Sequence, residues 1–441
     1  MIKKSIYLLL VVYLLINQAA HADLHLELTQ GIDSALPIAV VPFAGQNTNN
    51  STTKVAAIIQ QDLQNSGRFN PLDANAMMQF PNSISSVDRS YWKSAKVNDV
   101  VVGSVKSSGN GLYTVSFGLI NLYAKPVAGA NPQTQGVLAS QTFNNVPAAA
   151  LRAMGHHIAD IVYQKLMNKR GIFSTKIAYV VQLNSSNYRL EVSDYDGYNP
   201  QTVLRSTAPI MSPAWSPDGK ELAYVSFEHG NPTIYISTLA TGKRRVAANF
   251  QGINSAPAFS PDGKKLALVL SLTDSLNIYI KNLSTGKLQQ VTNDVDAIDT
   301  EPDWSPDGQK LLFTSDAGGS PQIYQTDLNT NKTMRLTFNG SYNARASYTP
   351  DGQSIVILHR MDDGTYTIAI QDLSSGRLQI LAEPPGTQSP SIAPNGDMII
   401  YNFRDTNNRH LLGVISTDGK VQIRLPSLDG DAKDPAWSPF L

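Results

Sequence analysis

The chain has 441 residues and contains no cysteine. This absence excludes disulfides, thiolate metal sites, iron–sulfur clusters and thiol catalysis. An excess of one charge is also missing, because 35 Lys and Arg balance 35 Asp and Glu. A protein that binds nucleic acid through bulk positive charge would carry a basic excess. We therefore expect no nucleic-acid partner.

Signatures of catalysis are missing as well. No G-x-S-x-G nucleophile elbow, phosphate-binding loop or dinucleotide-binding fingerprint occurs. His156 and His157 are adjacent on a predicted helix, so their rings point about 100° apart, and we interpret them as a surface pair rather than a metal site. Asp294, Asp296 and Asp299 lack the glycine and final glutamate of an EF-hand loop, so a calcium site is only an alternative. We expect no enzyme activity, no cofactor and no bound metal.

The one long apolar run stands at the N-terminus. Residues 1–22 place Lys3 and Lys4 before this run and end in the A-x-A site Ala20–Ala22. The pattern is typical of a secretory signal peptide, and an uncleaved membrane anchor is the alternative. No other stretch approaches the roughly 20 apolar residues of a membrane span. We expect an exported mature chain that begins at Asp23 and does not span a membrane.

A repeated phrase fills the C-terminal part of the chain. PAWSPDGKELAYVS from Pro213 returns as PAFSPDGKKLALVL from Pro257 and as PDWSPDGQKLLFTS from Pro302. Weaker copies begin at Ala346 and Pro390, and the truncated copy PAWSPFL ends the chain. The proline of the S-P-D-G element recurs at intervals of 44 or 45, at positions 217, 261, 306, 350, 394 and 439. Four short strands in each repeat of this length predict a β-propeller.

Six such units predict six blades over residues 177–441. Ile177–Val181 (IAYVV) matches a second strand, but no P-A-W-S strand precedes it. Pro435–Pro439 supplies a matching first strand, so we expect the C-terminus to complete the first blade and close the ring. The repeated aspartates indicate hydrogen-bonded turns rather than catalysis. Three tryptophans share one repeat position and are expected to pack between blades: Trp215, Trp304 and Trp437.

Residues 23–170 lack the repeat and predict a small α/β domain. Alternating or continuous apolar patterns predict strands at 23–28, 37–43, 99–105, 112–121 and 137–143. Helices are expected at 53–65, before Gly67, and from Pro147 to Met167, before Lys169–Gly171. Residues 171–176 form the linker, and 123–135 are expected to be a loop. The predicted fold class is therefore two-domain, α/β followed by an all-β propeller.

The starts of the innermost strands predict a binding face. The first strand of each propeller blade lines the central channel, so the loops that enter these strands converge around one mouth. These loops differ from one another while the strands that follow are alike, as expected of a specific binding surface. Ordinary solvated loops are the alternative. The expected binding residues are Met211, Ser212, Asn254, Ser255, Ala256, Thr300, Glu301, Asn343, Arg345, Gln388, Ser389 and Lys433.

The whole mature chain resembles the TolB family of the Tol–Pal system of Gram-negative bacteria. The resemblance includes LTQGIDSALPIAVVPF at 28–43, EVSDYDGYNPQ at 191–201, MSPAWSPDGKELAYVSFE at 211–228 and the closing PAWSPFL. W-S-P-D-G is common among propellers, whereas the N-terminal block together with the D-Y-D-G-Y run is specific. The resemblance implies a monomeric periplasmic protein without catalytic activity or cofactor.

The resemblance also implies two partners. The propeller face would bind the periplasmic domain of Pal, an outer-membrane lipoprotein, most directly at 254–256 and 300–301. The N-terminal segment would engage the C-terminal domain of TolA, an inner-membrane protein, and its alternation fits β-strand addition. The implied role is to link the membranes, to maintain outer-membrane integrity and to aid invagination at division. The TolA segment would comprise Asp23, Leu24, His25, Leu26, Glu27, Leu28, Thr29, Gln30, Gly31 and Ile32.

We hypothesise that the N-terminal strand alternates between packing on its own domain interface and release for TolA, and that Pal binding biases this equilibrium. One alternative is a propeller enzyme or small-ligand binder, such as a glycan-processing lyase. It would need acids, His or Tyr in the channel, where the strands offer mostly Ala, Ser and Trp. A second alternative is a peptidoglycan-binding scaffold.

Overall fold

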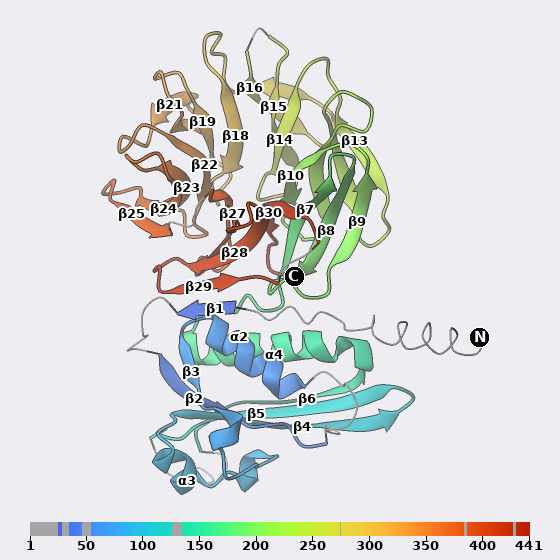
Figure 1. The fold of residues 1–441 in the computed structure, drawn as a ribbon, viewed down its shortest axis with the longest axis vertical. Coiled ribbons are helices and arrows are strands. Elements are labelled where there is room, and N and C mark those ends of the chain that lie inside the picture. The colour runs from blue at the N-terminus through green and yellow to red at the C-terminus, as the bar shows by residue number, and fades with distance from the viewer. Residues whose placement is uncertain are drawn as a thin grey trace, which may run out of the picture.

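The computed structural model describes residues 25–28, 35–45, 54–125, 135–273, 275–382, 386–426 and 429–441. The predicted signal peptide, most of the predicted loop at 123–135, and residues 23, 24 and 29–32 of the predicted TolA segment lie outside these ranges. The described residues form an α/β domain at one end and a ring of β-sheets at the other (Figure 1). No helix within them is long and apolar enough to cross a membrane.

The N-terminal domain is a five-stranded sheet of order β3-β2-β4-β5-β6, in which β2 runs parallel to β3 and β4. Its helices α2 and α4 lie between the sheet and the propeller (Figure 1). The strands are β2 (Leu36–Val40), β3 (Phe69–Pro71), β4 (Asp99–Gly109), β5 (Leu112–Asn121) and β6 (Val137–Pro147). The helices are α2 (Val55–Asn65), α3 (Arg89–Ser94) and α4 (Leu151–Met167), with short 3₁₀ turns η1 (Ala74–Ala76), η2 (Ile84–Ser86) and η3 (Ala148–Ala150).

Both predicted helices end where expected, at Asn65 and Met167, but α4 begins later than expected. Residues 148–150 form a 3₁₀ turn, so α4 begins later than the proline at 147 indicated. Asn168 adopts a left-handed φ of 54° and its N–H bonds to the Gln164 carbonyl, which ends the helix at Met167, as predicted. The short β3 and α3 were not predicted, because neither is long enough to show a clear hydrophobic period.

The propeller consists of six antiparallel sheets, which confirms the predicted blade number. Figure 1 shows them arranged around a central axis. From the innermost strand outward, blade 1 consists of β30 (Asp431–Trp437), β7 (Lys176–Asn184), β8 (Asn187–Asp194) and β9 (Gln201–Ser206), and blade 2 of β10 (Ile210–Trp215), β11 (Glu221–Ser226), β12 (Thr233–Thr238) and β13 (Arg244–Ala248). Blade 3 consists of β14 (Asn254–Phe259), β15 (Lys265–Leu270), β16 (Asn277–Asn282) and β17 (Leu288–Gln290), and blade 4 of β18 (Asp299–Trp304), β19 (Lys310–Ser315), β20 (Gln322–Asp327) and β21 (Lys332–Arg335). Blade 5 consists of β22 (Asn343–Tyr348), β23 (Ser354–Arg360), β24 (Tyr366–Asp372) and β25 (Leu378–Ala382), and blade 6 of β26 (Gln388–Ile392), β27 (Met398–Arg404), β28 (His410–Ser416) and β29 (Val421–Arg424).

Strands from the two ends of the chain join the first and last blades. The C-terminal β30 pairs antiparallel with β7, with Ala432 opposite Val181, and so supplies the innermost strand of blade 1. The N-terminal β1 (His25–Leu28) pairs antiparallel with β29 and adds a fifth, outermost strand to blade 6. Arg170 donates to the carbonyl of Leu441 and stacks on Phe440, which ties the chain end to the segment before β7.

The repeated tryptophans have two different roles. Trp215 and Trp304 each donate their indole N–H to a carbonyl in the preceding blade, at Ala436 and Ala258, as the inter-blade prediction requires. Trp437 instead donates to Thr175 Oγ1, just before β7, at 2.8 Å, and belongs to an apolar cluster shared with the N-terminal domain. Its position beside the domain interface explains this difference.

The S-P-D-G turns are held by side-chain hydrogen bonds, as predicted. In blade 2, Ser216 Oγ donates to Asp218 Oδ1 at 2.7 Å, and the Lys220 N–H donates to the same oxygen at 3.1 Å. The bond from Ser216 lowers the pKa of Asp218. Similar turns recur in the other complete copies, and they stand at the end of each innermost strand, away from the mouth.

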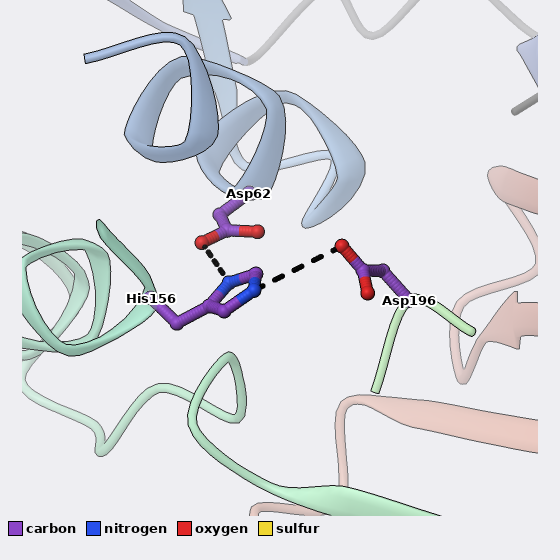
Figure 2. Close-up of side chains that lie close together, drawn as sticks. All are labelled: Asp62, His156 and Asp196. Carbon is purple, nitrogen blue, oxygen red and sulfur yellow. Dashed lines mark hydrogen bonds and ion pairs between the residues drawn. The ribbon is translucent and has the colours of Figure 1, made fainter. Parts of the chain in front are cut away.

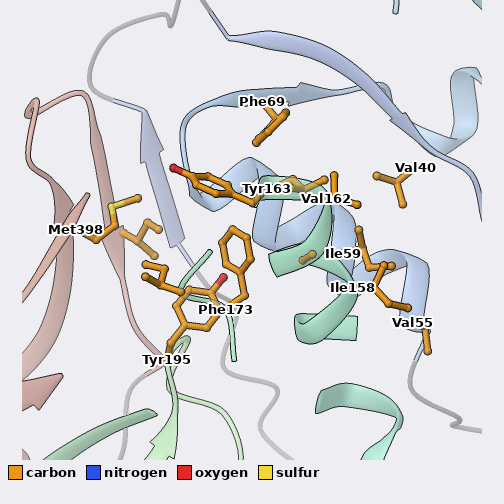
Figure 3. Packing of buried hydrophobic residues seen from close by; sticks show 14 of the residues in the cluster. Val40, Val55, Ile59, Phe69, Ile158, Val162, Tyr163, Phe173, Tyr195 and Met398 are labelled. Atoms are coloured by element: carbon orange, nitrogen blue, oxygen red, sulfur yellow. The ribbon is translucent and has the colours of Figure 1, made fainter. Parts of the chain in front are cut away.

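The largest apolar cluster crosses from one domain to the other (Figure 3). It begins between the N-terminal sheet and α2, where Ile59 is fully buried, and continues through Tyr163 of α4. Phe173 of the linker packs edge-on against Tyr163 and tilts toward Tyr195 of blade 1. Met398 of blade 6 completes the cluster on the propeller side. The two domains therefore share a hydrophobic core.

We expect deletion of residues 431–441 to lower the free energy of unfolding by more than about 4 kcal/mol, because blade 1 would lose its innermost strand and an inter-blade contact. Thermal and denaturant unfolding measure this loss. Deletion of Leu441 alone is the control and should be much milder, because it removes no residue of β30 and affects only the bond from Arg170 at the chain end. Equal stabilities of the two deletions would contradict the structural role of β30.

Candidate functional site

A cavity of about 470 Å³ opens among the six innermost strands of the propeller. Its lining is rich in proline and aromatic residues that come from equivalent positions of the repeat, with few ionisable groups. The innermost strands begin at one end of this channel, which we call the mouth. They finish at the S-P-D-G turns at the other end. The N-terminal domain contacts the propeller at the turn end, where Lys169 pairs with Asp397 at 2.6 Å.

Each innermost strand carries one non-glycine residue with a left-handed backbone and a register shift. Such residues cost free energy and persist where the surrounding structure fixes them. A bulge also bends its strand and re-aims the neighbouring side chains. The predicted binding residues therefore lie within the first half of the strands rather than in the preceding loops. The six left-handed residues are Ser212, Ala256, Glu301, Arg345, Ser389 and Asp434, with φ between 46° and 57°.

Arg345 links blades 4, 5, 6 and 1 across the mouth. Its Nε lies 2.9 Å from Glu301 Oε1 and its Nη1 lies 3.3 Å from Asp434 Oδ1. Nη1 also bonds Ser389 Oγ, which itself donates to Asp434 at 3.0 Å. Burial acts against the charge, but the carboxylates of Glu301 and Asp434 outweigh it and raise the pKa of Arg345. The guanidinium therefore remains charged and braces the bulges.

Two of the predicted binding residues are fully buried and support the mouth from beneath. The Asn254 side chain accepts from the Phe250 N–H at 2.9 Å and donates to the Phe250 carbonyl at 2.7 Å. Asn343 donates to Gln322 Oε1 and bonds His359 Nδ1, each at 2.8 Å. These asparagines hold the strand starts in position and offer no side-chain surface to a partner.

The other predicted residues offer varying amounts of surface. Met211 and Gln388 are exposed, whereas Ser255, Ala256 and Thr300 are half-buried. Lys433 is half-buried as well, and its Nζ donates to Gln182 Oε1 at 2.9 Å. The mouth therefore presents a mixture of free and internally bonded groups.

An apolar rim surrounds part of the mouth, and sequence reasoning missed most of it. Exposed large apolar side chains in the described residues concentrate at the mouth end of consecutive blades. Only Met211 was a predicted binding residue. The sequence contains an indication of this rim, because Ile253 and Ile298 directly precede innermost strands, at positions where a solvated loop would be polar. The apolar rim consists of Met211, Ile253, Leu272, Val295, Ile298 and Phe338.

The acidic cluster at 294–299 does not converge on one point. Asp299 is buried, and burial raises its pKa, with hydrogen bonds from Ser315 and Thr292 acting against the rise. Asp296 is exposed, and its backbone N–H bonds the side chain of Asp294. We therefore interpret residues 294–299 as a loop held by internal hydrogen bonds rather than as a calcium site.

A second cluster lies at the domain interface and corrects the interpretation of the histidine pair (Figure 2). His156 is 2% exposed, whereas His157 is exposed as predicted. His156 Nδ1 lies 2.8 Å from Asp62 Oδ2 of α2, and Nε2 lies 3.9 Å from Asp196 Oδ2 of the turn between β8 and β9. Tyr195 donates its hydroxyl to Asp62 Oδ1 at 2.7 Å.

The close approach of α4 to α2 explains why His156 is buried. A Cβ at Gly155 would lie 2.8 Å from the Cβ of Ile58, so only glycine allows this helix contact. The contact turns His156 toward Asp62, while His157 on the next position faces Phe143. The surface interpretation was wrong for His156 because the sequence does not tell which face of α4 meets the propeller.

The interface cluster does not fit a metal ion shared by all three residues. Asp62, His156 and Asp196 are the one group of three ionisable side chains in the described residues whose possible ligand atoms lie within 4.8 Å of one another. However, the two carboxylates face different ring nitrogens (Figure 2), which is an arrangement of hydrogen bonds around the ring rather than of ligands around one ion. We therefore interpret the group as a hydrogen-bonded charge network.

The predicted TolA segment is described only at His25–Leu28. These residues form β1, and their backbone pairs with β29 from His25 opposite Arg424 to Leu28 opposite Val421. In Figure 1, β1 lies between the propeller and the helices of the N-terminal domain. The segment therefore occupies a sheet edge of its own chain.

The α/β domain and the six sheets around a braced, partly apolar mouth define a two-domain β-propeller protein. Residues 24–127 match the TolB amino-terminal domain, and residues 163–441 match the TolB beta propeller domain. The chain belongs to the TolB family.

Similar proteins cover nearly the whole chain. It is 49% identical over 436 residues to the Tol-Pal system protein TolB of Hamiltonella defensa, covering 98% of this chain and 99% of that protein. It is 48% identical to the Coxiella burnetii protein of the same name, covering 100% and 99%. The crystal structure of TolB from Acinetobacter baumannii superposes with a TM-score of 0.83 at 39% identity, covering 95% of this chain and all of that chain.

We expect Arg345→Gln to lower the free energy of unfolding by roughly 1 kcal/mol, a modest loss because the side chain is 38% exposed and screened by solvent. The double variant with Glu301→Gln should lose less than the sum of the two single variants, since the residues interact. Denaturant unfolding of the four proteins measures the coupling. Strict additivity would show that the pair does not brace the mouth.

Proposed function

We propose that this chain is a periplasmic component of the Tol–Pal system that binds the periplasmic domain of Pal at the propeller mouth and the C-terminal domain of TolA through its N-terminal segment. Membership of the TolB family supports the system, because the curated relatives are named Tol-Pal system proteins. The signal-peptide pattern at 1–22 supports the compartment.

The observation that carries the Pal proposal is the apolar rim beside a braced mouth. Exposed apolar side chains gathered at one end of a protein indicate an interaction surface. The Arg345 network and the buried asparagines fix the strand starts before any partner arrives. A preformed surface loses little conformational freedom on binding, which favours affinity.

The backbone pairing of β1 supports the TolA proposal. A segment that adds to the edge of β29 through main-chain hydrogen bonds can add to the edge of another sheet in the same way. The two pairings exclude each other, so TolA would gain access only when β1 leaves β29. Because β1 lies beside the N-terminal domain, the proposed Pal and TolA sites stand at different ends of the propeller.

A binding role is favoured over an enzyme that uses the channel. The pKa of Asp303 in the channel is raised to about 6 by burial, with hydrogen bonds from the Tyr348 and Trp304 N–H groups acting against the rise. The Tyr348 N–H lies 3.0 Å from its carboxylate and joins blades 4 and 5. Arg345 and Glu301 already neutralise each other at 2.9 Å. Asp303 thus has a structural partner within the channel. In the proposed function, the protein acts by linking the two membranes and by stabilising the outer membrane during division.

We expect Val295→Asp to weaken binding of the Pal periplasmic domain at least tenfold, about 1.4 kcal/mol, because it puts a charge into the apolar rim. Calorimetry with the mature chain measures the dissociation constant. Val246→Asp is the matched control, since Val246 is 54% exposed on the outermost strand of blade 2 and Val295 is 64% exposed. If both variants bind Pal as tightly as the wild type, the Pal site does not lie at the rim.

A disulfide between β1 and β29 tests the TolA proposal. The chain has no cysteine of its own, so the pair Glu27→Cys and Gln422→Cys, whose Cα atoms are partners in the ladder, would form a unique bridge. We expect the oxidised variant to lose TolA binding and to keep Pal binding, and reduction to restore TolA binding. Each single-cysteine variant serves as a control. TolA binding that survives verified oxidation would show that release of β1 is not required.

A further inference from the structure

Charged groups from both domains meet around His156, and the proposed function makes no use of them. From α2 comes Asp62, and from α4 come Arg152 and Asp160. The propeller contributes Asp194 at the end of β8, and Tyr195 and Asp196 in the turn that follows. Lys176 of β7 pairs with Asp194. Arg152 binds Asp194 and Asp196 and so crosses the interface.

The charge balance of this cluster depends on one proton. Four carboxylates, those of Asp62, Asp160, Asp194 and Asp196, face two permanent cations, Arg152 and Lys176. With a neutral His156 the sum is −4 + 2 = −2, and with an imidazolium it is −1. Since like charges repel strongly where water is excluded, the protonated ring suits this site better.

The hydrogen-bond geometry leads to the same protonation state. His156 Nδ1 bonds Asp62 at 2.8 Å, so it carries a hydrogen when Asp62 is ionised. Nε2 is buried without a hydrogen-bond partner and lies 3.9 Å from Asp196 Oδ2. A neutral ring would direct the lone pair of Nε2 at a carboxylate, whereas an imidazolium would direct an N–H at it.

We propose that His156 is a proton-controlled latch between the two domains: the closed interface holds the imidazolium, and loss of its proton loosens the contact between α4 and the turn at Tyr195–Asp196. Other interface contacts remain when this happens. Tyr163 donates to Asp397 at 2.8 Å, and Arg68 pairs with Asp418 at 3.3 Å. The latch therefore tunes the strength of the interface rather than separating the domains.

The pKa directions agree with this geometry. Burial lowers the pKa of His156, but the charge of Asp62 and its hydrogen bond outweigh burial and raise the pKa above its usual value. Burial raises the pKa of Asp62 to about 6. A group whose pKa is higher in the folded state stabilises below its unfolded pKa and loses this effect as pH rises through the folded value. The contribution of His156 is thus present near pH 6.5 and is lost as pH rises through its raised pKa, and it also declines below about pH 6, where Asp62 takes up a proton.

Surface carboxylates act in a separate pH window. The pKa of Asp372 is lowered to about 2 by hydrogen bonds from Ser374 and Ser375. Such a group loses its stabilising effect only as pH falls below its unfolded value, near 3.9. Any change between pH 6 and 9 therefore does not come from these turns.

Two measurements on the full mature chain test the latch. An NMR titration of the histidine ring carbons, with His156 assigned through His156→Gln, should give a pKa above 6.5 for His156. Hydrogen exchange of the turn at 193–199, corrected for intrinsic rates, should show an opening constant that increases between pH 6 and 9. The opening constant should increase about tenfold for each unit by which the pKa of His156 in the closed interface exceeds its pKa in the open interface. A peptide at 254–259, in the innermost strand of blade 3, should show no such increase.

Matched variants separate the latch from a general loss of stability. His157→Gln, on the exposed neighbouring position, should titrate and exchange like the wild type. His156→Gln should open the turn more at pH 6 and should remove the dependence on pH. If this variant does not fold, Asp196→Asn, which removes the charge facing Nε2, should lower the pKa of His156. A His156 pKa at or below 6.5 in the wild type, or an opening constant unchanged from pH 6 to 9, would overturn the proposal.

Discussion

The position of α2 and α4 between their own sheet and the propeller is the constraint on which the rest of this molecule depends. Each helix must bury apolar side chains on two sides, and the shared cluster around Tyr163 and Phe173 satisfies both. Once these helices are fixed, blades 1 and 6 face the N-terminal domain and the mouth faces away from it. The edge of β29 then lies where β1 can reach it. Packing at one interface thus determines where both proposed partners would bind.

In the propeller, the residues that stabilise the blades are repeated, whereas the residues at the mouth differ from blade to blade. The S-P-D-G turns recur from blade to blade, and tryptophan stands at the same position of three of the six innermost strands; the turns provide stability through local hydrogen bonds. The mouth departs from this symmetry, because one arginine, Arg345, pairs with carboxylates from two different blades. The apolar rim likewise occupies part of the circumference only. A partner would therefore meet an asymmetric surface on a nearly symmetric scaffold, which is what fixes a binding orientation.

The propeller could be predicted from the sequence because the same motif recurs at a regular interval. The interval of 44 or 45 residues and the P-A-W-S phrase locate blades without any knowledge of tertiary contacts. The left-handed bulges could not be predicted, because residues such as Ser212 and Glu301 do not favour positive φ and adopt it through their neighbours. The burial of His156 was also hidden, since adjacent histidines on a helix give no sign of which one meets another domain. Gly155 was the available clue, because a glycine within a helix often marks a close helix contact.

The pairing of β30 with β7 has a consequence for the order in which the chain can fold. The outer strands of blade 1 are among the first propeller residues to be synthesised, but their innermost partner is the last. Until the final residues are available, the sheet edge at β7 stays open and the ring cannot close. The N-terminal domain can form its own sheet long before that moment. Completion of blade 1, and with it of the mouth, therefore depends on residues 431–437.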